Sequence, residues 1–189
     1  MNEQELIGLL RNGDEGAFKM LVESQQDRVF NTVLGMIQDV SEAEDIAQEV
    51  FIQVFRSIEG FKGDSKLSTW IYRIAITKSL DWLRKKKVSD RFRRIRNVMG
   101  IEEKEILPVD FVHPGIQLEQ KESARSLFRA IALLPSNQKT AINLIKVEGL
   151  NYEEVSMIMK ISVKAVESLM HRAKENLRKT LKNDLQIKD

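Results

Sequence analysis

The sequence predicts an all-helical protein made of two small domains, residues 1–87 and 121–184, joined by a flexible linker over residues 88–120. Only nine glycines and three prolines interrupt the 189 residues, and apolar side chains recur at the 3.6-residue spacing of helices. That spacing fades in the linker, where two of the prolines lie. A chain of this length is able to bury a substantial core in one or two domains.

The amino-acid composition indicates a protein of a reducing, aqueous compartment. Charged residues make up 31% of the chain and hydrophobic residues 42%, as in soluble globular proteins. The absence of cysteine excludes disulfides and thiolate metal sites and fits a reducing cytoplasm. No signal peptide is visible, and no apolar run approaches the roughly 20 residues that span a bilayer. We therefore expect a cytoplasmic protein without membrane insertion and without a cofactor.

The small net charge of +2 hides a strong segregation along the chain. Residues 1–60 carry 4 basic and 12 acidic side chains, whereas residues 61–100 carry 12 basic and 3 acidic ones. The next twenty residues are acidic again, and residues 121–189 carry 13 basic and 8 acidic side chains. This alternation indicates different partners for different parts, with polyanions for the basic blocks.

Three helices are expected in the acidic first part. Residues 3–12 form a short one, and Asp14 in the following turn is a candidate N-cap for a long helix over residues 15–38. The third helix is expected to open at Ser41, which has the spacing of a capping box with Glu44.

The third helix has an exposed face in which apolar side chains stand among polar and acidic ones. This face contains Asp45, Gln48, Glu49, Ile52 and Phe55. Such a mixture is typical of a protein-binding surface rather than of plain solvation. A metal site at Asp45 and Glu49, one turn apart, is the alternative; acids at this spacing are common on solvated helices, and no histidine lies nearby.

A helix within residues 64–87 carries both tryptophans and ends in four consecutive basic residues. On a helical wheel Trp82 falls on the apolar arc, so we expect it to pack in the core. Trp70 falls in the middle of the polar and basic face, beside a glycine-containing loop. There it would either stack on unpaired bases while neighbouring cations hold phosphates, or cap the helix against the loop.

The last part of the chain has the pattern of a helix-turn-helix. Asn151 and Ser162 are candidate N-caps of its two helices, and apolar side chains supply the contacts between them. The outward face of the second helix, where a recognition helix meets base edges and phosphates, contains Lys164, Glu167, Ser168, His171, Arg172, Lys174 and Arg178. An ordinary helical hairpin is the alternative. The chain's other histidine, His113, lies in the linker, so His171 does not indicate a metal site.

Taken in order, these stretches resemble the extracytoplasmic-function (ECF) group of sigma factors in the sigma-70 family, over nearly the whole chain. DEGAFKMLVESQQDRVFNTV is similar to region 2.1, and EDIAQEVFIQVFRSI to region 2.2, which binds the clamp helices of RNA polymerase. FKGDSKLSTWIYRIAITKSLDWLRKKK resembles regions 2.3 and 2.4, which melt and read the −10 element. LPSNQKTAINLIKVEGLNYEEVSMIMKISVKAVESLMHRAKENLRK resembles region 4, which reads the −35 element.

The resemblance implies a transcription initiation factor that has no enzymatic activity of its own. Its partners would be core RNA polymerase, held by the mixed face of the third helix, promoter DNA and an anti-sigma factor. The implied −10 contacts are Phe61, Lys62, Ser65, Lys66, Ser68, Thr69, Trp70, Arg73, Thr77 and Lys78. The implied −35 contacts are those of the recognition helix, with region 2 over residues 1–87 and region 4 over residues 121–184.

Some residues depart from the pattern of this family. Leu67 stands where an aromatic residue is frequent, and Thr77 where asparagine is frequent, which affects the expected −10 base preference. Glu167 and Leu169 replace common basic residues, which predicts a different −35 sequence rather than a different docking mode. A stand-alone helix-turn-helix regulator would explain residues 121–184 equally well, but not the mixed acidic face or the helix with both tryptophans.

Overall fold

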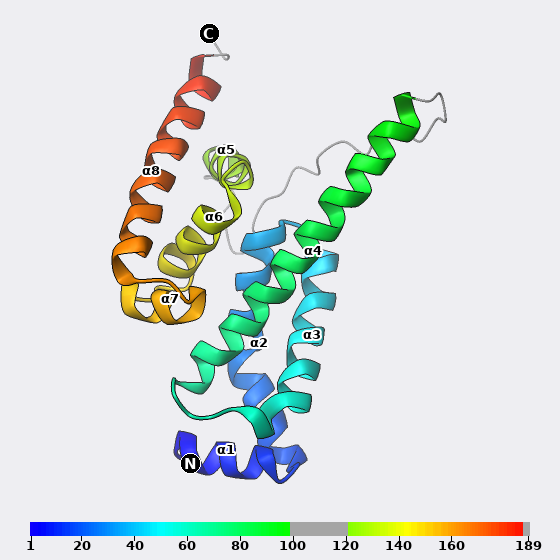
Figure 1. Cartoon of the computed structure of the whole chain (residues 1–189), viewed down its shortest axis with the longest axis vertical. Helices are drawn as coiled ribbons and strands as arrows, with labels where there is room; N and C mark the ends of the chain where they lie inside the picture. Colours follow the sequence, from blue (N-terminus) through cyan, green and yellow to red (C-terminus); the bar gives the residue numbers. More distant parts are fainter. Residues whose placement is uncertain (99–120, 187–189) are drawn as a thin grey trace.

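The computed structural model describes residues 1–98 and 121–186, and every regular element within them is a helix (Figure 1). The first domain contains α1 (Glu3–Arg11), α2 (Glu15–Ile37), α3 (Val40–Ser57), the short 3-10 helix η1 (Ile58–Gly60) and α4 (Leu67–Val98). The second contains α5 (Lys121–Ala132), α6 (Ser136–Ile142), the π-helical turn η3 (Asn143–Val147), α7 (Tyr152–Met159) and α8 (Val163–Gln186). The expected all-helical class is confirmed. The linker predicted over residues 88–120 is wrong for its first part, because residues 88–98 belong to α4; residues 99–120 lie outside the described residues.

The N-caps of the first domain confirm one expectation and correct another. The Asp14 carboxylate accepts a hydrogen bond from the Ala17 amide at 2.7 Å, as the sequence predicts. The capping box predicted at Ser41 and Glu44 is wrong, because the N-cap of α3 is Asp39 and the helix begins at Val40.

The junction of α2 and α3 explains this earlier start. Gln38 ends α2 in the left-handed conformation, with φ 57°, and Asp39 returns to an extended backbone. The Asp39 carboxylate then accepts from the Glu42 amide at 3.2 Å, which satisfies one of the free donors of α3. Gln38 and Asp39 alone thus connect the two helices.

α2, α3 and α4 pack side by side along the first domain, and α1 lies across one end of them (Figure 1). Their facing side chains form the core, with Val33, Leu34, Val50 and Ala75 fully buried. A fully buried aliphatic side chain of this size contributes roughly 1.5–3 kcal/mol, so this apolar seam holds the domain together.

The C-terminal half of α4 is longer than the hydrophobic pattern suggests. The helix continues past residue 87 to Val98 and projects beyond α2 and α3 (Figure 1). Fading periodicity therefore does not mark the end of this helix. Lysine and arginine favour helices, and Arg84 pairs with Asp81 one turn earlier.

Trp82 lies at the edge of the core rather than inside it. Its indole is partly buried, and its Nε1 donates to a Glu42 carboxylate oxygen at 2.7 Å. The Lys86 ammonium lies 4.5 Å from the centre of the ring, a cation–π contact on its outer face. The expected core packing of Trp82 is thus confirmed in part, because the polar end of the indole still needs a partner.

The second domain has the caps and turn that the sequence predicts. Asn151 and Glu154 form a reciprocal capping box, with hydrogen bonds of 2.9 and 3.1 Å. Lys160 ends α7 in the left-handed conformation, with φ 55°, and Ser162 accepts from the Ala165 amide at 3.2 Å at the start of α8. These features define the short turn between α7 and α8.

The two domains pack against each other and share one continuous cluster of buried side chains. η3 lies against α2, and α7 lies against α4. None of the helices in the described parts of the chain is long and apolar enough to cross a membrane.

Candidate nucleic-acid and protein interfaces

The face of α3 that the sequence singled out is open to solvent. Asp45, Gln48, Glu49, Ile52 and Phe55 are all exposed. Ile52 and Phe55 keep 49% and 51% of their surface accessible, which is high for such side chains. The Phe55 ring also meets Phe18 of α2 edge to face, with centroids 5.2 Å apart, so α2 positions it on the surface.

An ion pair joins this α3 face to the neighbouring α4. Lys78 Nζ lies 3.0 Å from Glu49 Oε2, and the lysine side chain is only 26% exposed. Glu49 therefore already has a cationic partner in the protein. The metal-site alternative at Asp45 and Glu49 loses support, because Lys78 supplies the positive charge locally.

The residues implied for −10 contacts divide into an outer and an inner group. Lys62, Lys66 and Thr77 are exposed, and Ser65, Ser68, Trp70, Arg73 and Lys78 are partly so. Phe61 and Thr69, in contrast, are 4% and 3% exposed and belong to the interior. Direct DNA contact by these two side chains does not fit this structure, because both are buried, Phe61 in the loop and Thr69 in the first turn of α4.

Trp70 rests on one of these buried residues. Its ring lies 5.1 Å from that of Phe61, and the indole is partly buried against the core. This packing agrees with a role of Trp70 in capping the helix. The part of the indole that stays exposed can still stack on an unpaired base. The two interpretations are therefore compatible, with Phe61 supporting Trp70 from inside.

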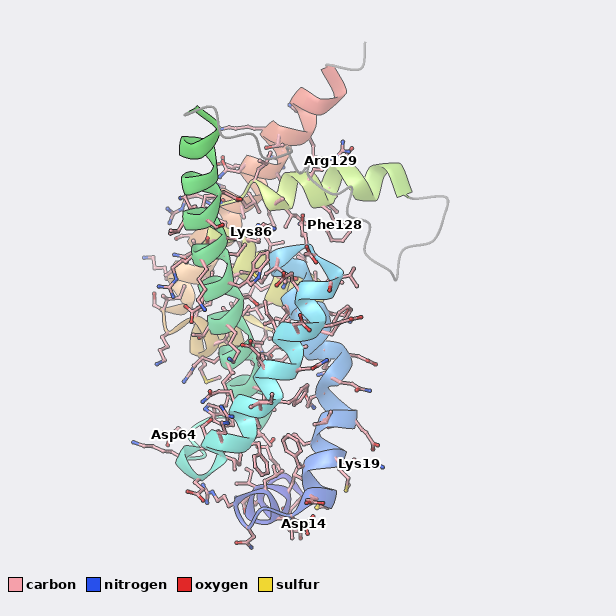
Figure 2. The ribbon with its side chains drawn as sticks, turned by 90° about the vertical axis from the view of Figure 1, so that its right-hand side faces the viewer. Asp14, Lys19, Asp64, Lys86, Phe128 and Arg129 are labelled. Carbon is pink, nitrogen blue, oxygen red and sulfur yellow. The ribbon has the colours of Figure 1, made fainter. Side chains whose placement is uncertain are left out.

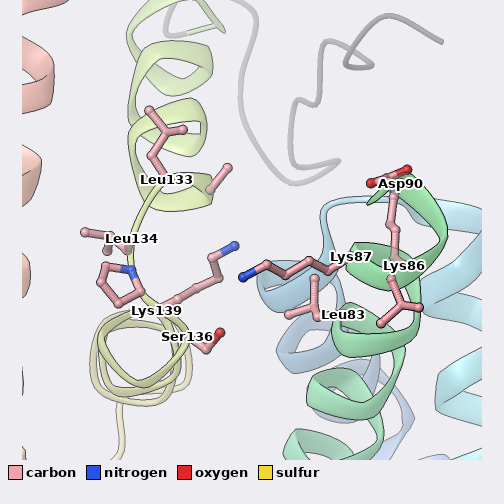
Figure 3. Close-up of a pocket in the computed structure, with 11 residues that line it drawn as sticks. Leu83, Lys86, Lys87, Asp90, Leu133, Leu134, Ser136 and Lys139 are labelled. Atoms are coloured by element: carbon pink, nitrogen blue, oxygen red, sulfur yellow. The ribbon is translucent and has the colours of Figure 1, made fainter. Parts of the chain in front are cut away.

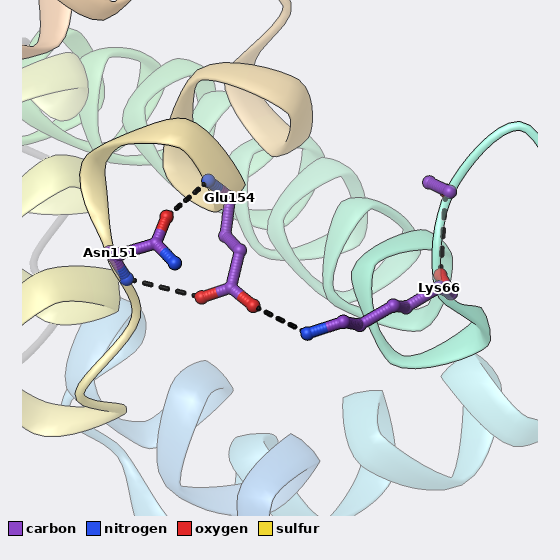
Figure 4. Close-up of polar contacts among 4 residues, drawn as sticks. Lys66, Asn151 and Glu154 are labelled. Atoms are coloured by element: carbon purple, nitrogen blue, oxygen red, sulfur yellow. Dashed lines mark hydrogen bonds and ion pairs between the residues drawn. The ribbon is translucent and has the colours of Figure 1, made fainter.

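Several polar groups on this surface contact the second domain. Lys66 Nζ lies 3.1 Å from Glu154, and Figure 4 shows how the same carboxylate also closes the Asn151 capping box. Both partners lower the pKa of Glu154, the backbone amide of Asn151 first and Lys66 second. The Arg73 guanidinium donates to the main-chain oxygen of Met157 in α7 at 2.6 Å.

The outward face of α8 carries all the residues predicted to contact −35 DNA. Lys164, Glu167, Ser168, His171, Arg172, Lys174 and Arg178 are exposed. Val166, Met170 and Ala173 on the opposite face are buried, so packing fixes which side of the helix looks outward. The four central members of the exposed set line one shallow hollow.

Contacts within α8 orient some of these side chains. The Ser168 hydroxyl donates to the Lys164 carbonyl at 2.9 Å, and Arg172 Nε donates to the Ser168 carbonyl at 3.3 Å. His171 Nε2 lies 3.6 Å from a carboxylate oxygen of Glu175. Glu175 was absent from the predicted set, although its spacing of four residues from His171 indicates this contact.

A cleft of about 830 Å³ lies between α4 and the turn from α5 to α6 (Figure 3). Lys87 and Lys139 point toward each other across it (Figure 3). Lys139 is 7% exposed, and burial lowers the pKa of its ammonium group. Leu133 at the rim is 74% exposed. This cleft was not predictable from sequence patterns, because its walls come from the two separate domains.

Two buried hydrogen bonds between the domains were also not predicted from the sequence. Asn143 Nδ2 in η3 donates to the Thr32 carbonyl at 2.7 Å, across 111 positions of sequence. The Tyr72 hydroxyl donates to Glu148 at 3.0 Å. Burial raises the pKa of Glu148, which the hydrogen bond from Tyr72 partly offsets. Burial and the nearby Glu148 charge raise the pKa of Tyr72.

Comparison with known protein families agrees with this arrangement. Residues 21–88 match the model of sigma-70 region 2, and residues 124–177 match the model of sigma-70 region 4. The first match contains the α3 face and the loop before α4, and the second contains the helix-turn-helix. The α3 face and the loop before α4 therefore fall inside the first match, and the −35 residues from Lys164 to Lys174 fall inside the second.

Curated relatives align over almost the full chain. The RNA polymerase sigma-H factor of Pseudomonas aeruginosa is 32% identical over 184 residues, covering 95% of this chain and 93% of the relative. The ECF RNA polymerase sigma factor SigW of Bacillus subtilis is 33% identical over 178 residues, covering 94% and 95%.

Solved structures share the fold. CnrH, solved in complex with the cytosolic domain of CnrY, superposes with a TM-score of 0.69 at 19% identity, covering 96% of this chain and 98% of that one. The sigma factor RpoE of Bartonella quintana, solved with the anti-sigma factor NepR, gives 0.63 at 21% identity, covering 87% and 96%. With relatives above 30% identity along nearly its whole length, the chain belongs to the extracytoplasmic-function group of the sigma-70 family: it is a non-enzymatic sigma factor that directs RNA polymerase to promoters.

Proposed function

We propose that three separate surfaces divide the work of promoter recognition. The exposed face of α8 reads the −35 duplex. The supporting observation is the division of α8 into an exposed polar face and a buried apolar face. Every residue of the predicted set points outward, while the opposite side of α8 is buried against its own domain. A rigid helix with a polar outer face in a helix-turn-helix is the geometry that enters a major groove.

The exposed face of α3 binds core polymerase. Ile52 and Phe55 supply apolar contacts, and Asp45 and Glu49 supply charge that selects a basic partner surface. α2 and α4 hold this face rigid, through the Phe18 ring and the Lys78 ion pair.

The loop over residues 61–66 and the first turns of α4 capture the unpaired −10 strand. Lys62, Lys66 and Arg73 neutralise phosphates, and Trp70 offers a ring on which a base stacks. Phe61 and Thr69 act from beneath, by holding the loop and the indole in position.

Run-off transcription with core RNA polymerase and a library of promoters tests this assignment. We expect initiation at a defined subset of promoters that depends on this protein. A stand-alone helix-turn-helix regulator would instead bind duplex DNA without conferring initiation on core polymerase. The α3 face favours the sigma-factor assignment, because a stand-alone helix-turn-helix regulator does not need an exposed surface for binding core polymerase.

The same assignment implies a cytoplasmic protein, since polymerase and promoter DNA are there. It also implies control by an anti-sigma factor, as in the complex of the Bartonella quintana protein. The cleft between α4 and the α5–α6 turn fits an acidic amphipathic segment of such a partner. Leu133 at its rim is apolar, and Lys86, Lys87 and Lys139 provide complementary positive charge.

A further inference from the structure

Two lysines face each other across the cleft between α4 and the α5–α6 turn. Lys87 reaches into the cleft from α4, and Lys139 reaches into it from α6 (Figure 3). Lys86 and Ser136 line the same cleft and add a third cation and a hydroxyl group. Asp90 also lines it, but its carboxylate points away from the two facing ammonium groups (Figure 3). Positive charge therefore gathers where the two walls approach each other.

Lys139 carries its charge in an almost fully buried position. The residue is 7% exposed, and desolvation lowers the pKa of its ammonium group. Within the described parts of the chain, the ammonium groups of Lys87 and Lys139 form neither an ion pair nor a hydrogen bond. Buried charges in proteins are normally paired, and like charges that face each other repel. An anion between the two lysines would remove both costs.

The chemistry of the cleft favours a phosphate group over a carboxylate. A carboxylate neutralises one lysine, whereas a phosphate monoester carries roughly two negative charges near neutral pH and neutralises both. Its several oxygen atoms also accept hydrogen bonds from both ammonium groups at once. The volume of about 830 Å³ is typical of small-ligand sites, and Leu83, Leu133 and Leu134 supply the apolar walls that such sites have.

We propose that this cleft binds a small phosphate-bearing anion, such as pyrophosphate or a nucleoside diphosphate, with one phosphate group held between Lys87 and Lys139. Figure 2 shows Lys86 level with Phe128 of α5, and Asp64 at the other end of α4, so the anion stays clear of the loop assigned to the −10 strand. The proposal goes beyond promoter recognition and does not rest on it.

Isothermal titration calorimetry of the full chain with inorganic pyrophosphate, at constant ionic strength, tests the site. Lys87→Gln and Lys139→Gln each remove one of the facing charges and should weaken binding by about tenfold, the scale of one lost hydrogen bond to a charged group. Lys85→Gln is the matched control, because Lys85 is an exposed lysine of α4 outside the cleft lining, and it should bind like the parent. Binding of ADP, the second probe, should depend on Lys87 and Lys139 in the same way.

Thermal melts give an independent readout. Pyrophosphate that binds the folded chain should raise the melting temperature of the parent and of Lys85→Gln, and should raise that of Lys139→Gln much less. Without pyrophosphate, Lys139→Gln should melt no lower than the parent, because it removes an unpaired buried charge. Lys87 is exposed, so Lys87→Gln tests the site with little risk to the fold.

Three results would overturn the proposal. The first is a parent chain that does not bind pyrophosphate or ADP. The second is an equal loss of affinity in Lys85→Gln and Lys87→Gln, which would show attraction to the basic surface in general. The third is a peptide of glutamate and leucine residues that binds through Lys87 and Lys139 while pyrophosphate does not, which would make the cleft a protein interface only.

Discussion

Lys78 Nζ lies 3.0 Å from Glu49 Oε2, so a single ion pair links the α3 face assigned to polymerase with the helix assigned to the −10 strand. The two surfaces are thus held in a fixed relation by α3 and α4 packing together. An exposed ion pair contributes little to stability, about 1 kcal/mol or less. Its main effect is therefore to orient the two side chains on their surfaces.

Reversal of charge on the α3 face should weaken binding to core polymerase. Asp45→Lys combined with Glu49→Lys replaces acids that meet a basic partner, and Phe55→Ala removes an exposed ring at the proposed contact. Pull-down with core polymerase measures the effect, and circular dichroism should show little loss of helix. Glu44→Lys, an exposed charge reversal on the same helix outside this set, is the control. Undiminished capture of the reversed chain would remove α3 from the interface.

Trp70→Ala should reduce binding to single-stranded −10 oligonucleotides by roughly 1–3 kcal/mol, the usual contribution of one stacking platform. Trp70→Phe, which retains a ring, should lose less. Because α8 is untouched, binding to duplex −35 DNA should stay the same. An equal loss on both DNA probes would show that the indole only supports the fold, as its contact with Phe61 also allows.

Glu148→Gln should stabilise the packing of the two domains at neutral pH. Burial raises the pKa of Glu148 above its ordinary value, so its ionised form costs stability when the two domains are packed together. As pH rises through the carboxyl range, the wild-type chain therefore loses stability, whereas glutamine keeps an acceptor for Tyr72 without a charge.

Denaturant melts of both chains across the acidic to neutral range measure this difference. The gap between them should close on acidification, where Glu148 becomes protonated. Tyr72→Phe, which removes the donor, should destabilise the wild-type chain by roughly 1 kcal/mol. A pH-independent gap between Glu148→Gln and wild type would contradict the buried-charge explanation.

The start of α3 offers a direct comparison of two candidate caps. Asp39→Ala should cost about 0.5–2 kcal/mol in free energy of unfolding, because it removes the acceptor for the Glu42 amide. Ser41→Ala, within the first turn of the helix, should have little effect. Thermal melts of the two variants decide between them, and a larger loss in Ser41→Ala than in Asp39→Ala would contradict the cap at Asp39.

Local signals predicted most of the helices and the α8 face, since caps and apolar spacing are encoded within a few residues. The cap of α3 was misplaced because Asp39 and Ser41 are both good capping residues, and the backbone at Gln38 decides between them. The domain interface was not predictable from local patterns, because residues such as Asn143 and Thr32, which form a hydrogen bond across it, are 111 positions apart in the sequence. The family resemblance implies Phe61 and Thr69 as −10 contacts, yet the fold turns their side chains inward.

The last prediction concerns −35 reading by the outer face of α8. Glu167 and Arg172 are exposed and line the same shallow hollow, while Lys174 lies further along the helix and Arg178 one turn beyond it. A side chain paired with a base edge contributes roughly 1–3 kcal/mol of discrimination against the wrong base. A phosphate contact weakens all sequences alike and lowers the salt slope by about one.

Glu167→Ala or Arg172→Ala should therefore relax preference at one or two −35 positions, whereas Lys174→Ala should lower affinity uniformly. Selection from randomised −35 duplexes measures preference, and a salt series measures the phosphate contribution. Arg172 has a further constraint, because its Nε is tied to the Ser168 carbonyl and leaves the outer nitrogens for the base. If the Glu167 variant selects the wild-type consensus unchanged, base reading rests on Lys164, Ser168, His171 and Arg172.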